Sequence, residues 1–219
     1  METETVSLFF ALLSLLALAA AAVLGVVGLV SWRSGGTRGA GLRADVGSVA
    51  LWLGFAVALT ATLGSLYYSE IAKFTPCKLC WYQRIAMYPL VLLLGIAAVR
   101  RDRGIRVYAL AQAGVGAAIA AYHTYLQAFP DSSSSFCTVD APCTLRHVWE
   151  LGFVSIPFMA LAGFLLIIAL LAVGSPIGGR GNDLAGSDDQ YVDVGVDDHP
   201  GNGALVGATP APADQESPS

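Results

Sequence analysis

Five long apolar stretches without a charged side chain constrain the fold of this chain more than any other feature. They cover residues 6–30, 49–69, 85–99, 107–129 and 153–173. The hydrocarbon core of a bilayer takes about 20 apolar residues per helix. Backbone amides inside lipid must pair within their own segment, so we expect helices, since membrane strands would alternate apolar and polar residues. The third stretch reaches this length only if Trp81 and Tyr82 begin it at the interface, where aromatic rings are favoured.

Composition supports a chain that folds in lipid. Charged residues make up 13% of the chain, whereas a soluble domain carries about a quarter. This share excludes an ordinary globular enzyme, and an apolar share of 55% excludes a disordered chain. A nucleic-acid-binding role would require basic residues concentrated on one face of a soluble module, and we expect none. The fold class is therefore an all-α membrane protein, a small bundle of helices.

The first stretch has two interpretations. Ala17, Leu18 and Ala19 offer small residues at which a secretory signal peptide could be cleaved. However, Glu2 and Glu4 stand where a signal peptide carries positive charge, and the apolar run of 25 residues is longer than such a peptide needs. We therefore expect this segment to be retained as a transmembrane helix.

The arginines predict the orientation of the bundle, because short loops rich in Lys and Arg stay in the cytoplasm. Seven of the twelve bases lie in two loops, as Arg33, Arg38 and Arg43 before the second stretch and as Arg100, Arg101, Arg103 and Arg106 before the fourth. This pattern places residues 70–83 and 130–152 of a multi-pass cell-membrane protein outside the cytoplasm, together with the amino terminus. All four cysteines lie in these two external segments, where the compartment is oxidising.

Residues 175–219 differ from the rest of the chain. They carry one base and eight acids, are rich in Gly, Asp, Pro and Ala, and have no apolar period long enough to pack. Such a composition predicts disorder, and the expected topology puts the segment in the cytoplasm. A solvating extension and a partner-binding tail both remain open.

The first two cysteines have the C-x2-C spacing of redox pairs. They occur in the sequence Thr75-Pro76-Cys77-Lys78-Leu79-Cys80. Thr75 is a suitable N-cap and Pro76 a suitable first helical residue, so we expect Cys77 in the first turn of a helix. Unpaired backbone amides, the helix dipole and the cation of Lys78 would favour a thiolate there. The sequence thus predicts a reactive pair at a helix N-terminus.

The second pair, Cys137 and Cys143, has C-x5-C spacing in a loop that also holds four consecutive serines and Pro142. Such a loop is able to present a disulfide to another protein. Two pairs on one external face suggest a relay, in which one pair exchanges with a soluble dithiol and the other passes the electrons on.

Electrons that leave a thiol pair at the membrane surface need an acceptor, and a lipid-soluble quinone is the obvious one. The sequence has no cysteines left for an iron–sulfur cluster and no C-x-x-C-H haem motif. Arg84 follows Cys80 by four residues and would share its helix face. A guanidinium there is costly without a partner, and an anion developing beside Cys80 would supply one. His123, near the external end of the fourth stretch, would hydrogen-bond a quinone oxygen or move protons.

These residues resemble a known family, the disulfide-bond formation protein B (DsbB) family of thiol oxidases. The resemblance extends over about residues 47–174 and is closest to the BdbC-like branch of the family. It rests on three stretches. CKLCWYQRIAMYP at 77–89 is similar to the family's first external loop, and HTYLQ at 123–127 is similar to the end of its third core helix. Cys143, WELG at 149–152 and Ile156-Pro157 are similar to its second loop and the start of its last helix.

The resemblance implies a four-transmembrane-helix bundle in residues 47–174, with an additional N-terminal transmembrane helix in residues 1–32 and an acidic cytoplasmic tail in residues 175–219. It also implies a membrane thiol:quinone oxidoreductase. Such an enzyme reoxidises a DsbA-like protein of thioredoxin fold, reduces ubiquinone or menaquinone, and so supports protein disulfide bond formation.

The resemblance also assigns roles to single residues. Cys77 and Cys80 would be the quinone-linked pair, with Cys80 nearer the quinone. Arg84 and His123 would bind the cofactor. Cys137 would form a mixed disulfide with the partner, with Cys143 as its mate, although the short gap between them is much tighter than in the best-known branch. No metal site is expected.

Several alternatives remain open. The two pairs could be structural disulfides in a non-enzymatic bundle such as an assembly factor, or the four cysteines could bind zinc. A vitamin K epoxide reductase-like protein also uses four helices, quinones and loop cysteines, but its C-x2-C pair follows the loop pair, whereas here it precedes it. Arg84 could be an interfacial arginine without chemistry, His123 a structural histidine of the bundle, and Trp149 an interfacial anchor.

Overall fold

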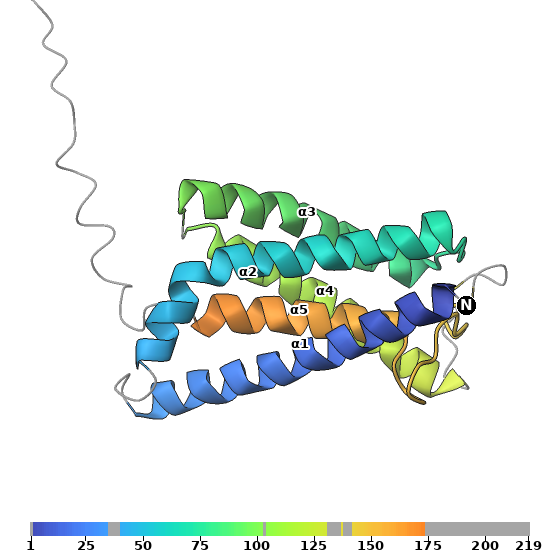
Figure 1. The fold of residues 1–219 in the computed structure, drawn as a ribbon, viewed down its shortest axis with the longest axis horizontal. Coiled ribbons are helices and arrows are strands. Elements are labelled where there is room, and N and C mark those ends of the chain that lie inside the picture. The colour runs from blue at the N-terminus through green and yellow to red at the C-terminus, as the bar shows by residue number, and fades with distance from the viewer. Residues whose placement is uncertain (1, 35–39, 103, 131–136, 138–141, 174–219) are drawn as a thin grey trace, which may run out of the picture. The chain divides into compact units, whose positions relative to one another are not determined.

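The computed structural model describes residues 2–34, 40–102, 104–130, 137 and 142–173 (Figure 1). Its five α-helices are α1 Glu2–Arg33, α2 Ala40–Leu66, α3 Lys78–Arg100, α4 Arg106–Ala128 and α5 Ile156–Val173. A π-helical turn, Tyr67–Ile71, prolongs α2. Within the described part of the chain, β pairing is limited to an isolated bridge between Glu150 and Val154. The predicted all-α fold class is confirmed.

Helix α5 lies at the centre of the packing. It contacts α1, α2 and α4, while α3 packs against α2 and α4 (Figure 1). Leu90 and Leu94 of α3 and Phe164 and Ile167 of α5 are completely buried in the shared core. Gly116 of α4 permits the closest approach, because a Cβ atom there would lie 2.3 Å from the Phe164 ring. Since lipid provides no hydrophobic drive between helices, close contacts of this kind hold such a bundle together.

Two helix boundaries differ from the sequence-based expectation. Helix α2 begins at Ala40 instead of residue 49, so Arg43 belongs to a helix and not to a loop. A membrane helix does not have to end with its apolar stretch, because charged side chains at its ends are solvated in the headgroup region. Helix α5 begins at Ile156 instead of residue 153. The preceding residues turn, with positive φ at Leu151 (53°) and Gly152 (79°).

The apolar helices make this a multi-pass membrane protein. Four described segments are long and apolar enough to cross a bilayer: Thr3–Arg33, Val49–Ile71, Lys78–Arg100 and Ile156–Val173. Helix α4, predicted as a fifth, does not meet this criterion, since it carries Arg106, Gln112, His123 and Gln127. Three of these, Arg106, His123 and Gln127, are buried inside the bundle. The predicted acidic tail lies outside the described residues.

Candidate functional site

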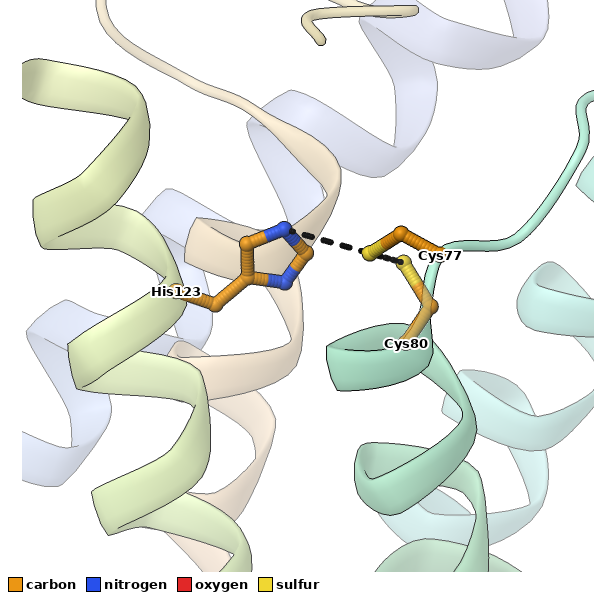
Figure 2. A group of neighbouring side chains, drawn as sticks. All are labelled: Cys77, Cys80 and His123. Carbon is orange, nitrogen blue, oxygen red and sulfur yellow. Dashed lines mark hydrogen bonds between the residues drawn. The ribbon is translucent and has the colours of Figure 1, made fainter. Parts of the chain in front are cut away.

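The first cysteine pair lies where α3 begins. Cys77 is the N-cap, with φ −75° and ψ 173°, and Lys78 is the first helical residue. The prediction of Thr75 as N-cap was therefore wrong by two residues. The first turn is closed by the Trp81 amide, which donates to the Cys77 carbonyl at 3.2 Å, and Thr75 and Pro76 stay outside the helix. The Sγ atoms of Cys77 and Cys80 lie 3.3 Å apart as free thiols (Figure 2).

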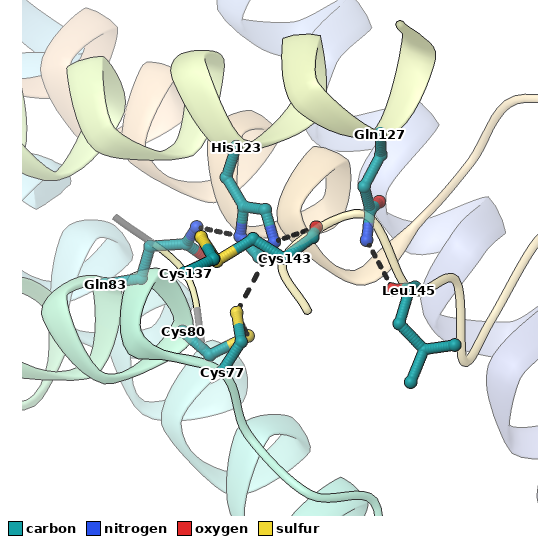
Figure 3. Close-up of a disulfide and its surroundings, with 8 residues drawn as sticks. All are labelled: Cys77, Cys80, Gln83, His123, Gln127, Cys137, Cys143 and Leu145. Carbon is teal, nitrogen blue, oxygen red and sulfur yellow. Dashed lines mark hydrogen bonds between the residues drawn. A yellow bond between two sulfur atoms is a disulfide. The ribbon is translucent and has the colours of Figure 1, made fainter. Parts of the chain in front are cut away.

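His123 of α4 is the polar centre of the site. It is 1% exposed, and its Nε2 lies 3.6 Å from the Cys77 Sγ and 3.1 Å from the Cys143 carbonyl oxygen (Figures 2 and 3). Because a carbonyl oxygen only accepts, Nε2 must carry a proton and donate it. The Gln83 side-chain amide of α3 lies 3.0 Å from Nδ1. Its NH₂ group would donate to a neutral ring, and its oxygen, after an amide flip, would accept from a protonated ring.

These neighbours lower the pKa of the Cys77 thiol. The pKa of the Cys77 thiol is lowered to about 4. The hydrogen bond with Cys80 is the largest cause, burial opposes it, and the hydrogen bond and charge of His123 also lower it. A thiolate is the form that attacks disulfides and leaves from them. The lowered pKa favours the expected thiolate, and its causes are Cys80 and His123, with no contribution from the cation of Lys78.

The second pair forms a disulfide, Cys137–Cys143, which lies beside the first pair (Figure 3). Cys143 is buried at 2% exposure in one apolar cluster with Cys77, Leu79 and Leu126, and Cys80 and Cys137 pack against that cluster. The predicted proximity of the two pairs is therefore present in the structure, with His123 touching both.

Two side chains of α4 and one of the following segment hold the residues after this disulfide to the C-terminal end of α4. His123 donates to the Cys143 carbonyl, and Gln127 donates its amide to the Leu145 carbonyl at 2.9 Å (Figure 3). Arg146 in turn donates from Nε to the Gln127 carbonyl at 3.0 Å. The Arg146 guanidinium also stacks 3.9 Å from the centre of the Trp149 ring. The described part of the second cysteine segment is thereby fixed to α4.

Arg84 lies one turn further along α3 than Cys80. Its Nε donates to the Ser65 hydroxyl at 2.9 Å and its terminal nitrogen to the Ser65 carbonyl at 3.1 Å. Its guanidinium also lies 5.3 Å from the centre of the Trp81 ring. These contacts position a permanent positive charge inside the bundle, next to a cavity that Cys80 also lines.

That cavity has a volume of about 440 Å³ and lies between α1, α2 and α5 at the cysteine end of α3. Its walls are mostly apolar, and Cys80, Gln83, Arg84 and Ser65 supply polar atoms on one side. Volumes of about 300–1,000 Å³, apolar walls and a few grouped polar atoms are typical of sites for small organic ligands. The predicted pairing of Cys80 with Arg84 at a ligand site is therefore geometrically possible.

A smaller cavity of about 120 Å³ lies on the other side of the thiols. Cys77, His123 and Gln127 line it, whereas His123 does not line the larger cavity. Cys80 and His147 line both. The sequence predicts His123 together with Arg84 at the cofactor. In the structure the His123 ring lies between the two cysteine pairs, and cofactor binding by His123 stays a prediction.

The same thiols also form a possible metal site. The ligand atoms of Cys77, Cys80 and His123 all lie within 4.8 Å of one another. Two thiolates and an imidazole are suitable zinc ligands, and a fourth position would remain for water. The geometry alone therefore permits either dithiol chemistry or metal binding at this position.

Three residues of the site were missed by sequence reasoning. Gln83 lies next to Arg84 in the sequence and three residues after Cys80, a helical spacing that could have been noticed. Ser65 and His147 carry no motif of their own. His147 stacks on Phe74, with ring centres 4.8 Å apart, and Phe74 stacks on Tyr68 at 5.9 Å. This aromatic stack lines the larger cavity.

Comparison with known proteins agrees with the geometry. The family model described as disulfide bond formation protein DsbB matches residues 47–174. Disulfide bond formation protein C of Bacillus subtilis (strain 168) is 48% identical over 126 residues, which are 57% of this chain and 91% of that protein. "Probable disulfide formation protein C 1" of Bacillus anthracis is 50% identical over 119 residues, or 54% of this chain and 86% of that protein. No solved structure gives a significant match.

Proposed function

The chain belongs to the DsbB family of disulfide bond formation proteins and is therefore a membrane thiol-disulfide oxidoreductase, and we propose that it reoxidises a DsbA-like protein of thioredoxin fold and passes the electrons to a membrane quinone. Residues 47–174 form the oxidase core in this proposal, residues 1–32 an added helix and residues 175–219 a cytoplasmic tail. The cysteine segments face the extracytoplasmic side in this proposal, as the arginine-rich segments at residues 33–43 and 100–106 predict.

The observation that carries the proposal is the contact between the two pairs. Cys77 and Cys143 share one apolar cluster, and the His123 Nε2 reaches both the Cys77 sulfur and the Cys143 carbonyl. Structural disulfides would have no need of a buried imidazole between them. Thiol–disulfide exchange benefits from one, because the ring stabilises the thiolate that attacks or leaves.

The exchange with the partner begins at Cys137. A thiolate of the reduced partner attacks the Cys137 sulfur, the Cys137–Cys143 bond breaks, and Cys143 leaves as a thiolate. The partner's second thiol then attacks the mixed disulfide, so the partner departs oxidised and Cys137 and Cys143 remain as a dithiol. Two further displacements transfer the electrons to a Cys77–Cys80 disulfide. The Cys77–Cys80 pair is then reduced, and Cys137–Cys143 is reoxidised.

The larger cavity fits a quinone by its chemistry. It combines apolar walls, suited to a ring and its isoprenoid tail, with the Arg84 guanidinium and the Ser65 hydroxyl, which are suited to a ring oxygen. A bound quinone would accept two electrons and two protons from the Cys77–Cys80 dithiol and so restore that disulfide. Arg84 would stabilise negative charge beside Cys80, and Ser65 would hold the guanidinium in place.

In this proposal His123 works on the thiol side of the pair. It donates to the Cys77 sulfur and holds the Cys143 carbonyl, so it keeps the two pairs within exchange distance. Gln83 orients the ring from α3. The polar groups of the site thus lie on two sides of Cys80. Arg84 is on the quinone side, and His123 is on the side of the Cys137–Cys143 disulfide.

The test is quinone absorbance with purified full-length protein in lipid, a short-chain quinone and a reduced thioredoxin-fold dithiol protein. We expect catalytic loss of the quinone absorbance and none with Cys80→Ser. Absence of quinone reduction in the wild type, or reduction that Cys80→Ser leaves unchanged, would contradict the proposal.

A zinc chelator and a metal analysis of the purified protein distinguish metal binding from dithiol chemistry at these cysteines. We expect turnover to be insensitive to a zinc chelator, because the thiols must be free to exchange. We also expect added Zn²⁺ to inhibit, since it would occupy Cys77, Cys80 and His123. Stoichiometric zinc in the purified protein, with loss of the fold on chelation, would favour a structural metal site.

A further inference from the structure

Helix α1 lies outside residues 47–174, the part of the chain that matches the family, yet it contributes a wall of the larger cavity. The α1 residues at the cavity are Phe10, Leu13, Ser14, Leu16, Ala17 and Ala20. They span about three helical turns on one side of the helix. The opposite walls come from α2, α3 and α5, which belong to the matched core.

Contacts at both ends of α1 keep this wall in place. Near the cysteine end, the Tyr68 hydroxyl donates to the Ser7 hydroxyl at 3.4 Å, and the Phe10 ring lies 6.0 Å from the Tyr68 ring. Phe10 also fills the space over Gly64. Near the other end, a Cβ atom at Gly28 would be in contact with the Val173 side chain of α5. Between these points α1 packs along α5.

Small side chains create the space between the walls. On α1 these are Ser14, Ala17 and Ala20, three residues apart, and Gly163 and Ala160 of α5 line the cavity as well. The Ser14 hydroxyl donates to the Ala11 carbonyl at 2.7 Å within its own helix, so it presents no free donor to the cavity. The α1 wall is therefore apolar, and its small side chains leave room for a ligand. Arg84 and Cys80 line the reactive side of the cavity.

We propose that α1 is a structural part of the quinone site, and that Ala17 and Ala20 determine which quinone ring and tail the site accepts. This inference rests on the proposed quinone reduction and extends it. A matched core without α1 would leave this side of the cavity open to lipid. With α1 present, the size of two alanine side chains limits the bound group.

The test enlarges these alanines and compares them with alanines on the outer side of the same helix. Ala17→Phe and Ala20→Phe fill the cavity, whereas Ala19 and Ala22 are exposed and line no part of it, so Ala19→Phe and Ala22→Phe are the controls. The readouts are the quinone retained per protein after purification of the full chain from membranes, and the Kd of a short-chain quinone in lipid nanodiscs. Neither readout needs turnover.

We expect Ala17→Phe and Ala20→Phe to weaken quinone binding by about tenfold or more, and the two controls to stay within about twofold, because overfilling a packed site excludes a ligand that an exposed position does not touch. Thermal unfolding checks that each variant folds. If Ala17→Phe does not fold, Ala17→Leu provides a smaller change with the same expected direction.

Ala160→Phe on the α5 wall separates the two possible failures. If it weakens quinone binding but Ala17→Phe and Ala20→Phe behave like Ala19→Phe, the role of α1 is overturned and quinone reduction stands. If the wild-type protein binds no quinone at all, both the role of α1 and the proposed quinone reduction are overturned.

Discussion

The two cysteine pairs are neighbours that are held in different ways. Cys77 caps α3 and Cys80 lies in its first turn, so the packing of α3 against α2 and α4 fixes their position. The segment of Cys143 is fixed by side-chain hydrogen bonds from the end of α4. His123 donates to the Cys143 carbonyl, and Gln127 donates to the carbonyl of Leu145, two residues after Cys143. The first pair also borders the larger cavity through Cys80, whereas neither Cys137 nor Cys143 does.

This difference agrees with the proposed division of labour. A pair set by helix packing would stay at a constant distance from the proposed quinone, which suits exchange with a small molecule in lipid. A pair fixed by a few hydrogen bonds can be displaced at small cost, which suits exchange with a large protein. Mutations should therefore separate the two halves of the reaction, and the following predictions test that separation.

The largest effect is expected from Cys80→Ser. Removing the thiol that borders the cavity should lower steady-state quinone reduction by about 10³-fold or more, as losses of catalytic nucleophiles do. The Cys137–Cys143 disulfide should still oxidise one equivalent of reduced partner. Acid quenching followed by thiol alkylation and mass spectrometry measures both. If Cys80→Ser also blocks the first equivalent, the two pairs do not act in sequence.

Arg84→Met should affect the acceptor half alone. A hydrogen bond to a charged group contributes about 1.5–3 kcal/mol, so we expect quinone reduction to slow by about 10- to 100-fold. Exchange with the partner should be unchanged. The matched control is Arg146→Met, whose guanidinium binds the Gln127 carbonyl instead. Single-turnover rates of each half report the effects. An equal loss in both halves would mean that Arg84 is structural.

His123→Ala should change the pH dependence of Cys77. Thiolate forms above the pKa, and the pKa of Cys77 is held low, so alkylation of the reduced protein should stay near its plateau down to about pH 5. Without His123 the pKa rises, and alkylation at about pH 5 should slow by about tenfold. Iodoacetamide labelling of the Cys77 peptide measures this. An unchanged profile would mean that His123 does not lower the pKa of Cys77.

Gln127→Leu should have the smallest effect. It removes one neutral hydrogen bond to the Leu145 carbonyl, which contributes about 0.5–1.5 kcal/mol. We expect transfer from Cys137–Cys143 to the first pair to slow by about two- to tenfold, with quinone affinity unchanged. The control is Gln112→Leu, because Gln112 bonds α3 backbone carbonyls away from the cysteines. Equal slowing in both variants would point to loosening of α4 as a whole.

Much of the fold follows from the apolar stretches, because lipid leaves helices as the solution for long charge-free segments. The stretches predicted α1, α3 and α4 within a few residues, apart from the first turns of α3, which depended on the interfacial Trp81 and Tyr82. They did not predict the start of α2, since a membrane helix does not have to end with its apolar stretch. They also did not predict the turn before α5, which depends on positive φ at Leu151 and Gly152.

The site was predictable where chemistry is local and not where it depends on packing. The spacing of Cys77, Cys80 and Arg84 lies within one helix, so the sequence indicated a common surface. The place of His123 depends on how α4 packs against α3, and no local pattern distinguishes the cavity from the space between the two cysteine pairs. The contribution of α1 could not be predicted either, because Ala17 and Ala20 are ordinary residues in an apolar helix.

The packing of α1 along α5 has a consequence for biogenesis. Among the described helices, α1 leaves the ribosome first and α5 last, so the longest-range contacts in the bundle form only when synthesis has passed residue 173. Until then α1 has few contacts with α2 and lies in the bilayer without its main packing partner. Contacts so distant in sequence form late. A chain truncated before α5 should therefore insert α1 and yet leave it exposed to quality control.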